Sequence, residues 1–229
     1  FIHKLLSTGL GVSHVVVGED FAFGQGRSGN FGLLQQNAEK GDFKVDQVSV
    51  AGSEEGVYSA SEARTLLIAG DVQGTARILG RLWEIEGRVR DGEKRGRQLG
   101  FPTANLAIAG TLHPAHGVYA LWAGLKNEIN GDWIWHPAVA NLGHRPTFDE
   151  NELLLEVHLL DFSGDIYGKS LRACFVAHVR PERRFGGLDA LKAQIATDSA
   201  SARELLAANT SPQKLVSLAT NTQSSRPIS

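Results

Sequence analysis

The order of apolar and polar positions divides the chain into two parts. Up to about residue 80, short apolar runs typical of strands (15–17 and 43–50) alternate with helical patterns (1–10, 33–40 and 59–81). Strands that alternate with helices are typical of α/β organisation with a parallel sheet. The pattern therefore predicts an α/β segment at the start of the chain.

Beyond residue 81 the pattern changes to short β-like runs separated by Gly, Pro, Asn and Asp. These runs lie at 83–90, 117–123, 133–141, 153–160 and 170–179. Strands at this spacing favour an antiparallel barrel or sandwich.

The end of the chain reads as a helix followed by a polar tail. Leucines and other apolar residues between 188 and 206 mark one face of an amphipathic helix. From 209 to 229 the chain is rich in Ser, Thr, Asn and Gln, which predicts disorder. We therefore predict an N-terminal domain with a bridging helix over 1–80, a β-rich domain over 81–208 and a disordered tail.

Composition and charge narrow the classes of protein. The 229 residues are 42% hydrophobic and 21% charged with a net charge of −2, so no basic field points to nucleic acid. The chain has no run of about 18 apolar residues, which a membrane helix would need, and it has no secretory signal pattern. We therefore expect a cytoplasmic protein without a membrane partner.

The sequence also limits the chemistry of cysteine. The lone Cys174 excludes an intramolecular disulfide and a cysteine zinc site. The chain has no Met and starts in a helix-like stretch, which indicates a fragment or else a processed or trimmed chain.

A basic, glycine-rich loop before residue 106 is the strongest candidate for chemistry. Glycines stand at 92, 96 and 100, and five basic residues stand at 88, 90, 94, 95 and 97. Exposed backbone N–H groups and positive charge can cradle phosphates. Such loops are more often plain hairpin turns without a ligand, and no Walker A motif is present.

The stretch after this loop carries oxygen ligands. Pro102 stiffens the chain, and on a strand Thr103 and Asn105 would point to the same face. Neutral side-chain oxygens at that spacing suit Mg²⁺, with phosphate oxygens completing its shell.

Glu156 is the candidate base. On a strand over 153–160 it would share a face with Leu154, His158 and Leu160. A carboxylate among apolar neighbours is costly unless it is paired or used, and it can accept a hydroxyl proton. An outward-facing glutamate on an edge strand is equally compatible with the residues. His158 is interpreted as structural.

Two further polar segments are less specific. Residues 141–147 predict a compact turn, in which Arg145 could pair with phosphate or form part of a plain β-turn. His113 and His116 have a His-x-x-His spacing, but Pro114 argues against a helix and no third ligand follows, so we do not expect a metal there.

Several segments in order resemble the riboflavin kinase domain of the bacterial bifunctional riboflavin kinase/FAD synthetase family. They are 96–106 (GRQLGFPTANL), 117–120 (GVYA), 141–148 (NLGHRPTF), 156–162 (EVHLLDF) and 165–168 (DIYG). The order and spacing hold over about residues 80–207. The resemblance implies an α+β chain: a six-stranded antiparallel Greek-key β-barrel with a C-terminal helix, preceded by a partial α/β nucleotidyltransferase domain. It also implies transfer of the γ-phosphoryl group of ATP to the 5′-hydroxyl of riboflavin, giving FMN and ADP.

The resemblance assigns roles to individual residues. Thr103 and Asn105 would bind Mg²⁺ and the nucleotide phosphates, and Glu156 would deprotonate the ribityl hydroxyl. Arg180 and Glu182 would lie near the flavin. The resemblance assigns ATP binding to the loop and to the proline that follows it: Gly92, Gly96, Arg97, Gly100 and Pro102.

The alternative is a non-catalytic flavin- or nucleotide-binding module. A binder would not need the carboxylate of Glu156, so the presence of Thr103, Asn105 and Glu156 together favours the enzyme. The first 80 residues resemble only the later part of the family's FAD synthetase domain. The His-x-Gly-His motif of that domain does not occur in the chain. We therefore expect a longer parent, but not this chain, to adenylylate FMN.

Overall fold

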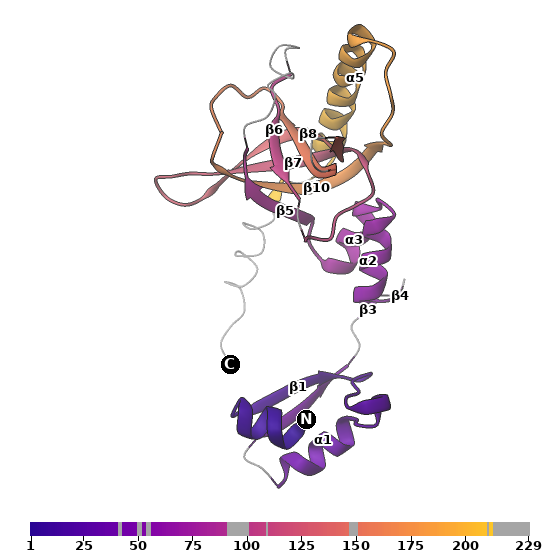
Figure 1. Cartoon of the computed structure of the whole chain (residues 1–229), viewed down its shortest axis with the longest axis vertical. Coiled ribbons are helices and arrows are strands. Elements are labelled where there is room, and N and C mark those ends of the chain that lie inside the picture. Colours follow the sequence, from indigo (N-terminus) through magenta and orange to yellow (C-terminus); the bar gives the residue numbers. More distant parts are fainter. Residues whose placement is uncertain are drawn as a thin grey trace. The chain divides into compact units, whose positions relative to one another are not determined.

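The computed structural model describes most of the chain as two compact units, Phe1–Tyr58 and Ser59–Ser229 (Figure 1). The described residues are 1–40, 43–49, 52–53, 56–90, 101–108, 110–146, 151–209 and 211–212. Most of the predicted disordered tail therefore lies outside the described residues. No helix in the described part of the chain has the length and apolar character needed to cross a bilayer.

The first unit has the α/β order that its sequence predicts. Strand β1 (His14–Gly18) pairs in parallel with β2 (Lys44–Val48), and helix α1 (Phe31–Ala38) lies between them in sequence. The remaining elements are short: the helical turns η1 (Ile2–Gly9) and η2 (Gln25–Arg27), and the strands β3 (Gly52–Ser53) and β4 (Gly56–Val57). A small core contains Leu6 of η1, Val17 of β1, Leu34 of α1 and Phe43, which directly precedes β2.

Two short helices open the second unit. Helix α2 (Ala60–Ile68) is capped by Ser59, which accepts a hydrogen bond from the Glu62 N–H, and α3 (Val72–Leu79) begins after Asp71. The contacts of α3 with two strands place both helices in this unit. The two compact units divide after Tyr58, so α2 and α3 belong to the second unit, and the family boundary near residue 80 stays a prediction.

Six antiparallel strands form a curled sheet. They are β5 (Trp83–Arg88), β6 (Ala104–Ala107), β7 (Gly117–Lys126), β8 (Trp133–Pro146), β9 (Asn151–Leu159) and β10 (Ser170–Arg180). Their spatial order is β5-β10-β7-β8-β9-β6, in which β10 returns to lie beside β7 after a three-stranded meander. This is Greek-key topology. The two edges meet at one bridge, where the Arg90 N–H donates to the Asn105 carbonyl at 2.9 Å. The expectation of a six-stranded antiparallel Greek-key barrel with a C-terminal helix is thereby confirmed.

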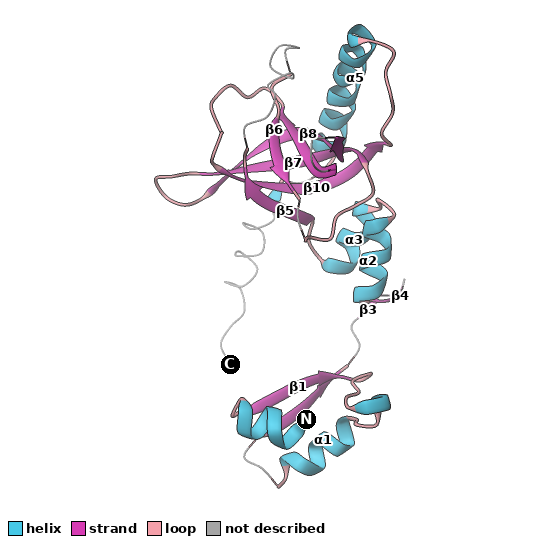
Figure 2. Cartoon of the chain, in the orientation of Figure 1, coloured by secondary structure: helices cyan, strands magenta, loops and turns pink. Residues whose placement is uncertain are grey.

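The two faces of this sheet have different neighbours. The inner face holds the main core, in which Tyr119 and Phe175 are fully buried, and α2 and α3 add Leu67 and Val72 to it. The outer face of β7, β8 and β10 is covered by α5 (Leu188–Ala207), which forms a separate core with them (Figure 2). Because residues alternate between faces, polar side chains on β6 and β9 can point outward without entering the core.

Candidate active site

Glu156 lies at the centre of a row of polar residues that crosses the strands. In the register of the sheet, Glu156 of β9 lies opposite Asn105 of β6 on one side and opposite Asn141 of β8 on the other. Directly opposed residues share a face, with Cβ atoms about 5 Å apart. All three side chains are half-buried, whereas their neighbours in sequence are buried, so the three project from the outer face.

From Asn141, the same line of opposed residues continues across β7 and β10, where helix α5 covers the sheet. Asn141 lies opposite Val118 of β7, and Val118 lies opposite Arg180 of β10. Val118 packs in the core that α5 forms with the sheet. The row therefore leads from the covered end at Arg180 to Asn105 on the edge strand β6.

Thr103 and Pro102 form a corner at the start of β6. Thr103 is half-buried like Asn105, while Ala104 between them is buried, so the two polar residues share the outer face. The Pro102 carbonyl accepts a hydrogen bond from Nδ1 of His158 at 2.9 Å. The structure thus brings Thr103, Asn105 and the Pro102 carbonyl to the side of the sheet that carries Glu156.

Arg90, one of the basic residues predicted around the glycine-rich loop, lies at the edge of the sheet next to β6. Arg90, which bridges to Asn105 through its backbone, donates from Nη1 to Oε1 of Glu152 at 2.8 Å. Glu152 lies on the same face of β9 as Glu156. The other predicted ATP-binding residues of the loop, at positions 92, 96, 97 and 100, lie outside the described residues.

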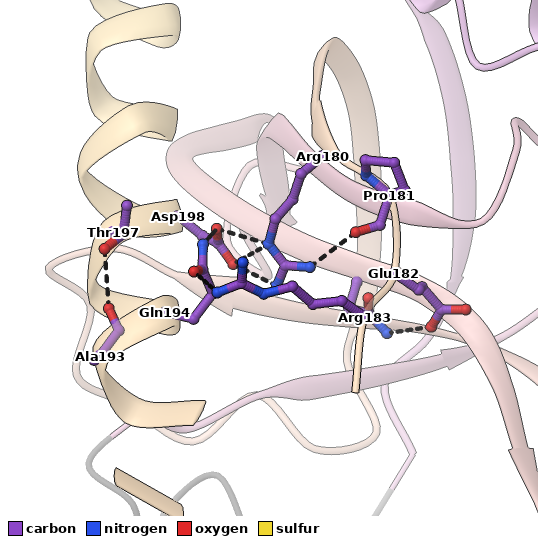
Figure 3. Close-up of polar contacts among 9 residues, drawn as sticks. Arg180, Pro181, Glu182, Arg183, Ala193, Gln194, Thr197 and Asp198 are labelled. Carbon is purple, nitrogen blue, oxygen red and sulfur yellow. Dashed lines mark hydrogen bonds and ion pairs between the residues drawn. The ribbon is translucent and has the colours of Figure 1, made fainter. Parts of the chain in front are cut away.

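Arg180, predicted near the flavin, is held by helix α5. Its Nε and Nη2 donate to the Asp198 carboxylate at 2.9 and 2.7 Å, and Nη1 donates to the Pro181 carbonyl (Figure 3). Asp198 is only 4% exposed and also accepts a hydrogen bond from Gln194 at 2.6 Å. The guanidinium therefore ties the end of β10 to α5.

Glu182, the other residue predicted near the flavin, reaches the polar row. Its Oε1 accepts a hydrogen bond from Asn141 Nδ2 at 3.2 Å, and its carboxylate lies against Gly143 at a point that a Cβ would occupy. Asn141 thus lies between two carboxylates, Glu156 and Glu182.

Asn141 is a site residue that the sequence pattern did not single out. The prediction of a compact turn over 141–147 is wrong, because β8 continues to Pro146 and pairs with β9 as far as Asn151. Gly143 and Pro146 suggested a turn, but alternation of buried positions continues through Ala138, Ala140 and Leu142. That alternation is the signal that would have placed Asn141 on the outer face. Arg145 lies on the same strand, and its side chain is outside the described part.

The donor set suits Mg²⁺ better than a transition metal. Within the described residues, no three His, Cys, Asp or Glu side chains come together as metal ligands. Thr103 and Asn105 supply neutral oxygens, and Mg²⁺ in nucleotide sites takes one or two protein ligands together with phosphate oxygens and water. These residues therefore fit the ion that the sequence implies.

His113 and His116 line an open cavity of about 700 Å³, whose lining includes none of the predicted site residues. Their rings stack at 5.9 Å, and His116 meets His144 edge-on at 4.9 Å.

The chain matches the sequence profiles of two protein families. The sequence profile of the riboflavin kinase family matches residues 79–206, more than half of the chain. The chain belongs to the riboflavin kinase family. The profile of FAD synthetase matches residues 1–62. Both parts of the predicted resemblance are thus confirmed.

Relatives of this riboflavin kinase family member match both units. A bifunctional riboflavin kinase/FMN adenylyltransferase of Pseudomonas fluorescens is 41% identical over 208 residues, which cover 90% of the chain and 65% of the relative. The protein of the same description from Escherichia coli K12 is also 41% identical, over 89% of the chain and 64% of the relative. The chain therefore spans slightly less than two thirds of the length of these relatives.

One solved structure resembles most of the chain. A Streptococcus pneumoniae protein described as a macrolide-efflux protein superposes with a TM-score of 0.73 at 28% identity. The match covers 89% of the chain and 64% of that protein. The likeness extends beyond the riboflavin kinase unit.

Proposed function

We propose that the chain is a riboflavin kinase that transfers the γ-phosphoryl group of ATP to the 5′-hydroxyl of riboflavin, giving FMN and ADP. The observation that carries this proposal is the position of Glu156 between Asn105 and Asn141, on the face that Thr103 shares. A carboxylate beside neutral oxygen ligands is what phosphorylation of an alcohol requires.

In the proposed mechanism, Glu156 accepts the proton of the ribityl 5′-hydroxyl as that oxygen attacks the γ-phosphorus. The new bond joins this oxygen to phosphorus, and the bond from phosphorus to the bridging oxygen of ADP breaks. Phosphoryl transfer depends on positioning and charge neutralisation more than on covalent chemistry from the protein. The sheet supplies the positioning because Glu156 is fixed on a paired strand on both sides.

Thr103 and Asn105 would hold Mg²⁺ through their side-chain oxygens together with phosphate oxygens of the nucleotide. Bound there, the ion would neutralise negative charge on the triphosphate. Arg90, held by Glu152, would add a positive charge at the same edge of the sheet. We propose that Pro102 and the loop residues Gly92, Gly96, Arg97 and Gly100 complete the ATP site.

The row also suggests how the two substrates divide the surface. Asn105 borders Glu156 on the nucleotide side, and Asn141 with Glu182 borders it on the other. We therefore propose that the flavin approaches from the side of Glu182, with Arg180 holding the start of that segment against α5. Riboflavin, FMN, ATP and ADP are then the partners, without nucleic acid or membrane. Because the reaction consumes ATP, we place it in the cytoplasm.

Replacing Glu156 by Gln tests the proposal. Incubation of the wild-type chain with riboflavin, ATP and Mg²⁺ should form FMN, measured by chromatography with fluorescence detection. Loss of a general base should lower turnover at least about 100-fold while ATP affinity changes little. Unchanged turnover would refute the role of Glu156 as base.

A matched control separates this effect from a general loss of negative charge. Glu86 is another outward carboxylate on the sheet, paired with Arg172 at 2.8 Å, and Glu86→Gln should leave turnover near that of the wild type. Flavin binding by a wild-type chain that forms no FMN would instead identify a non-catalytic binding module.

The N-terminal unit is not expected to complete FAD synthesis in this chain. The chain contains no His-x-Gly-His sequence, which the FAD synthetase domain of the family uses at its ATP site. With FMN and ATP as substrates, we expect no FAD, and FAD formation would contradict this view. For a longer parent of this family we propose both activities.

A further inference from the structure

His158 occupies a position that the proposed reaction does not use. It lies on β9 two residues after Glu156, on the same outer face, and is half-buried. Its Nδ1 is 2.9 Å from the Pro102 carbonyl oxygen, and the Phe101 ring meets its ring nearly perpendicularly at 5.5 Å and 82°. A carbonyl oxygen only accepts hydrogen bonds, so Nδ1 carries the hydrogen and donates it.

This hydrogen bond replaces backbone pairing that is missing at the start of β6. The pairing of β6 with β9 begins at Ala104, opposite Val157, and residues 101–103 are not part of the strand. Pro102 has no N–H group and cannot donate to the sheet. The His158 ring reaches across from β9 to the carbonyl that precedes the first paired residues.

Fixing this carbonyl also fixes Thr103. The Pro102 carbonyl and the Thr103 N–H belong to one planar trans peptide, so they point in opposite directions and turn together. With the oxygen held toward His158 on β9, the Thr103 N–H is directed away from β9. This peptide plane and the pairing of Asn105 with Glu156 fix the chain on both sides of Thr103, and they thereby limit the directions that its side chain can take relative to Asn105.

We propose that His158 is a positioning residue of the nucleotide site: through its Nδ1–H bond to Pro102 it orients Thr103 beside Asn105 for the magnesium-bound triphosphate. The inference rests on the proposed riboflavin kinase function. His158 contacts neither substrate in this arrangement. Its contribution should therefore appear in the use of Mg²⁺-ATP and be absent from the binding of riboflavin.

Three replacements of His158 test whether the donor at the Nδ1 position is what matters. In His158→Asn the amide nitrogen takes about the place of Nδ1 and keeps a donor. In His158→Leu the side chain has a similar size and no donor. In His158→Gln the amide lies one carbon further out, and this polar residue suits a partly exposed position if the leucine variant does not fold.

Two readouts are measured for each variant. Steady-state FMN formation gives kcat and the KM values for Mg²⁺-ATP and for riboflavin. Calorimetry gives the Kd of the protein for a non-hydrolysable ATP analogue in the presence of Mg²⁺. This Kd does not depend on turnover. Loss of one hydrogen bond that orders the site should raise KM for Mg²⁺-ATP and this Kd about 10-fold in His158→Leu and His158→Gln. The KM for riboflavin should stay unchanged, and His158→Asn should remain near the wild type.

The outcomes separate positioning from a purely structural role. A structural role would lower the melting temperature or the active fraction without changing either nucleotide constant, and this result would overturn the inference. Equal damage by asparagine, glutamine and leucine would also overturn it, because the donor would then be irrelevant. Phe101→Leu serves as the control that removes the ring contact but leaves the hydrogen bond, and it should change the nucleotide constants less than His158→Leu.

Failure of the proposed function gives a different result. If the wild-type chain forms no FMN, the riboflavin kinase proposal fails, and the analogue Kd alone decides the role of His158. If the wild-type chain binds the Mg²⁺-bound ATP analogue no more tightly than His158→Leu does, the positioning role is overturned.

Discussion

Single residues of the site are placed by strand alternation. Asn105 and Glu156 lie 51 positions apart in the sequence, yet they are direct partners in the β6–β9 register. The sequence indicated that Thr103 and Asn105 share a face, because side chains alternate along a strand. It left open whether Glu156 merely faces solvent on an edge strand. The structure shows that β9 has neighbours on both sides, so Glu156 lies inside the sheet's outer face and not at its rim.

Thr103 carries a prediction at this scale. Replacing it by Ala removes one oxygen ligand, so the Mg²⁺ concentration for half-maximal FMN formation should rise, by about 10-fold if the lost contact is worth one charge-assisted hydrogen bond. Thr103→Ser keeps the hydroxyl and should restore much of the Mg²⁺ dependence. The measurement is FMN formation as a function of Mg²⁺ at fixed ATP. A normal Mg²⁺ dependence in Thr103→Ala would remove this residue from the metal shell.

At the scale of elements, one buried ion pair joins helix α5 to the sheet in addition to the apolar core between them. Arg180 at the end of β10 and Asp198 on α5 form paired hydrogen bonds, and the Asp198 side chain is 5% exposed (Figure 3). The sequence predicted the helix from its apolar face and considered Arg180 only as a flavin neighbour. The partner of Arg180, 18 positions further on, follows from the packing of α5 on the sheet.

Removal of Asp198 should therefore destabilise the second unit. Asp198→Ala leaves the Arg180 cation partly buried without its carboxylate, which should lower the free energy of unfolding by about 3–5 kcal/mol. Urea unfolding followed by circular dichroism measures this change. Arg203→Ala is the control, because it breaks an exposed pair of the same helix with Asp161, at 2.8 Å, and should cost less than about 1 kcal/mol. Equal losses in both variants would contradict the special role of the buried pair.

At the scale of the whole molecule, the single cysteine can report whether the sheet of the second unit is closed. Cys174 lies in the central region of β10, 3% exposed, and its Sγ donates to Glu84 at 3.6 Å. Burial, together with the charge of Glu84, raises the pKa of the Cys174 thiol well above its ordinary value. Since the thiolate is the reactive form, the native thiol should be unreactive until the sheet opens.

Thiol labelling should thus report opening of the sheet. With a disulfide reagent at neutral pH, Cys174 of the folded chain should react much more slowly than in urea, and the rate should follow the unfolding transition. Ile129→Cys places a second thiol at a position that is 96% exposed and should add one rapidly reacting group. Rapid labelling of both thiols in the folded protein would show that β10 is accessible without unfolding.

The sequence by itself determined the elements and the chemistry available to them. Hydrophobic periodicity located five of the six strands, the terminal helix and the α/β order of the first unit, because burial of one face dictates which positions must be apolar. The sixth strand, β6, was expected only from the family resemblance. The motif around Pro102, Thr103 and Asn105 identified the family. The prediction of a turn at 141–147 failed because Gly and Pro also occur near the end of a long paired strand, where the partner strand decides the conformation.

Only the tertiary structure decided which of these residues meet. Register between strands fixed Asn105, Glu156 and Asn141 in one row, and packing of α5 determined that Arg180 is bound by Asp198. Such contacts join positions far apart in the chain, and their partners depend on how the sheet curls and which face a helix covers. A local sequence pattern indicates whether a segment is a helix or a strand, but it does not indicate which segments lie beside it. The sequence therefore predicted several residues of the site one by one, and only the fold shows which of them are neighbours.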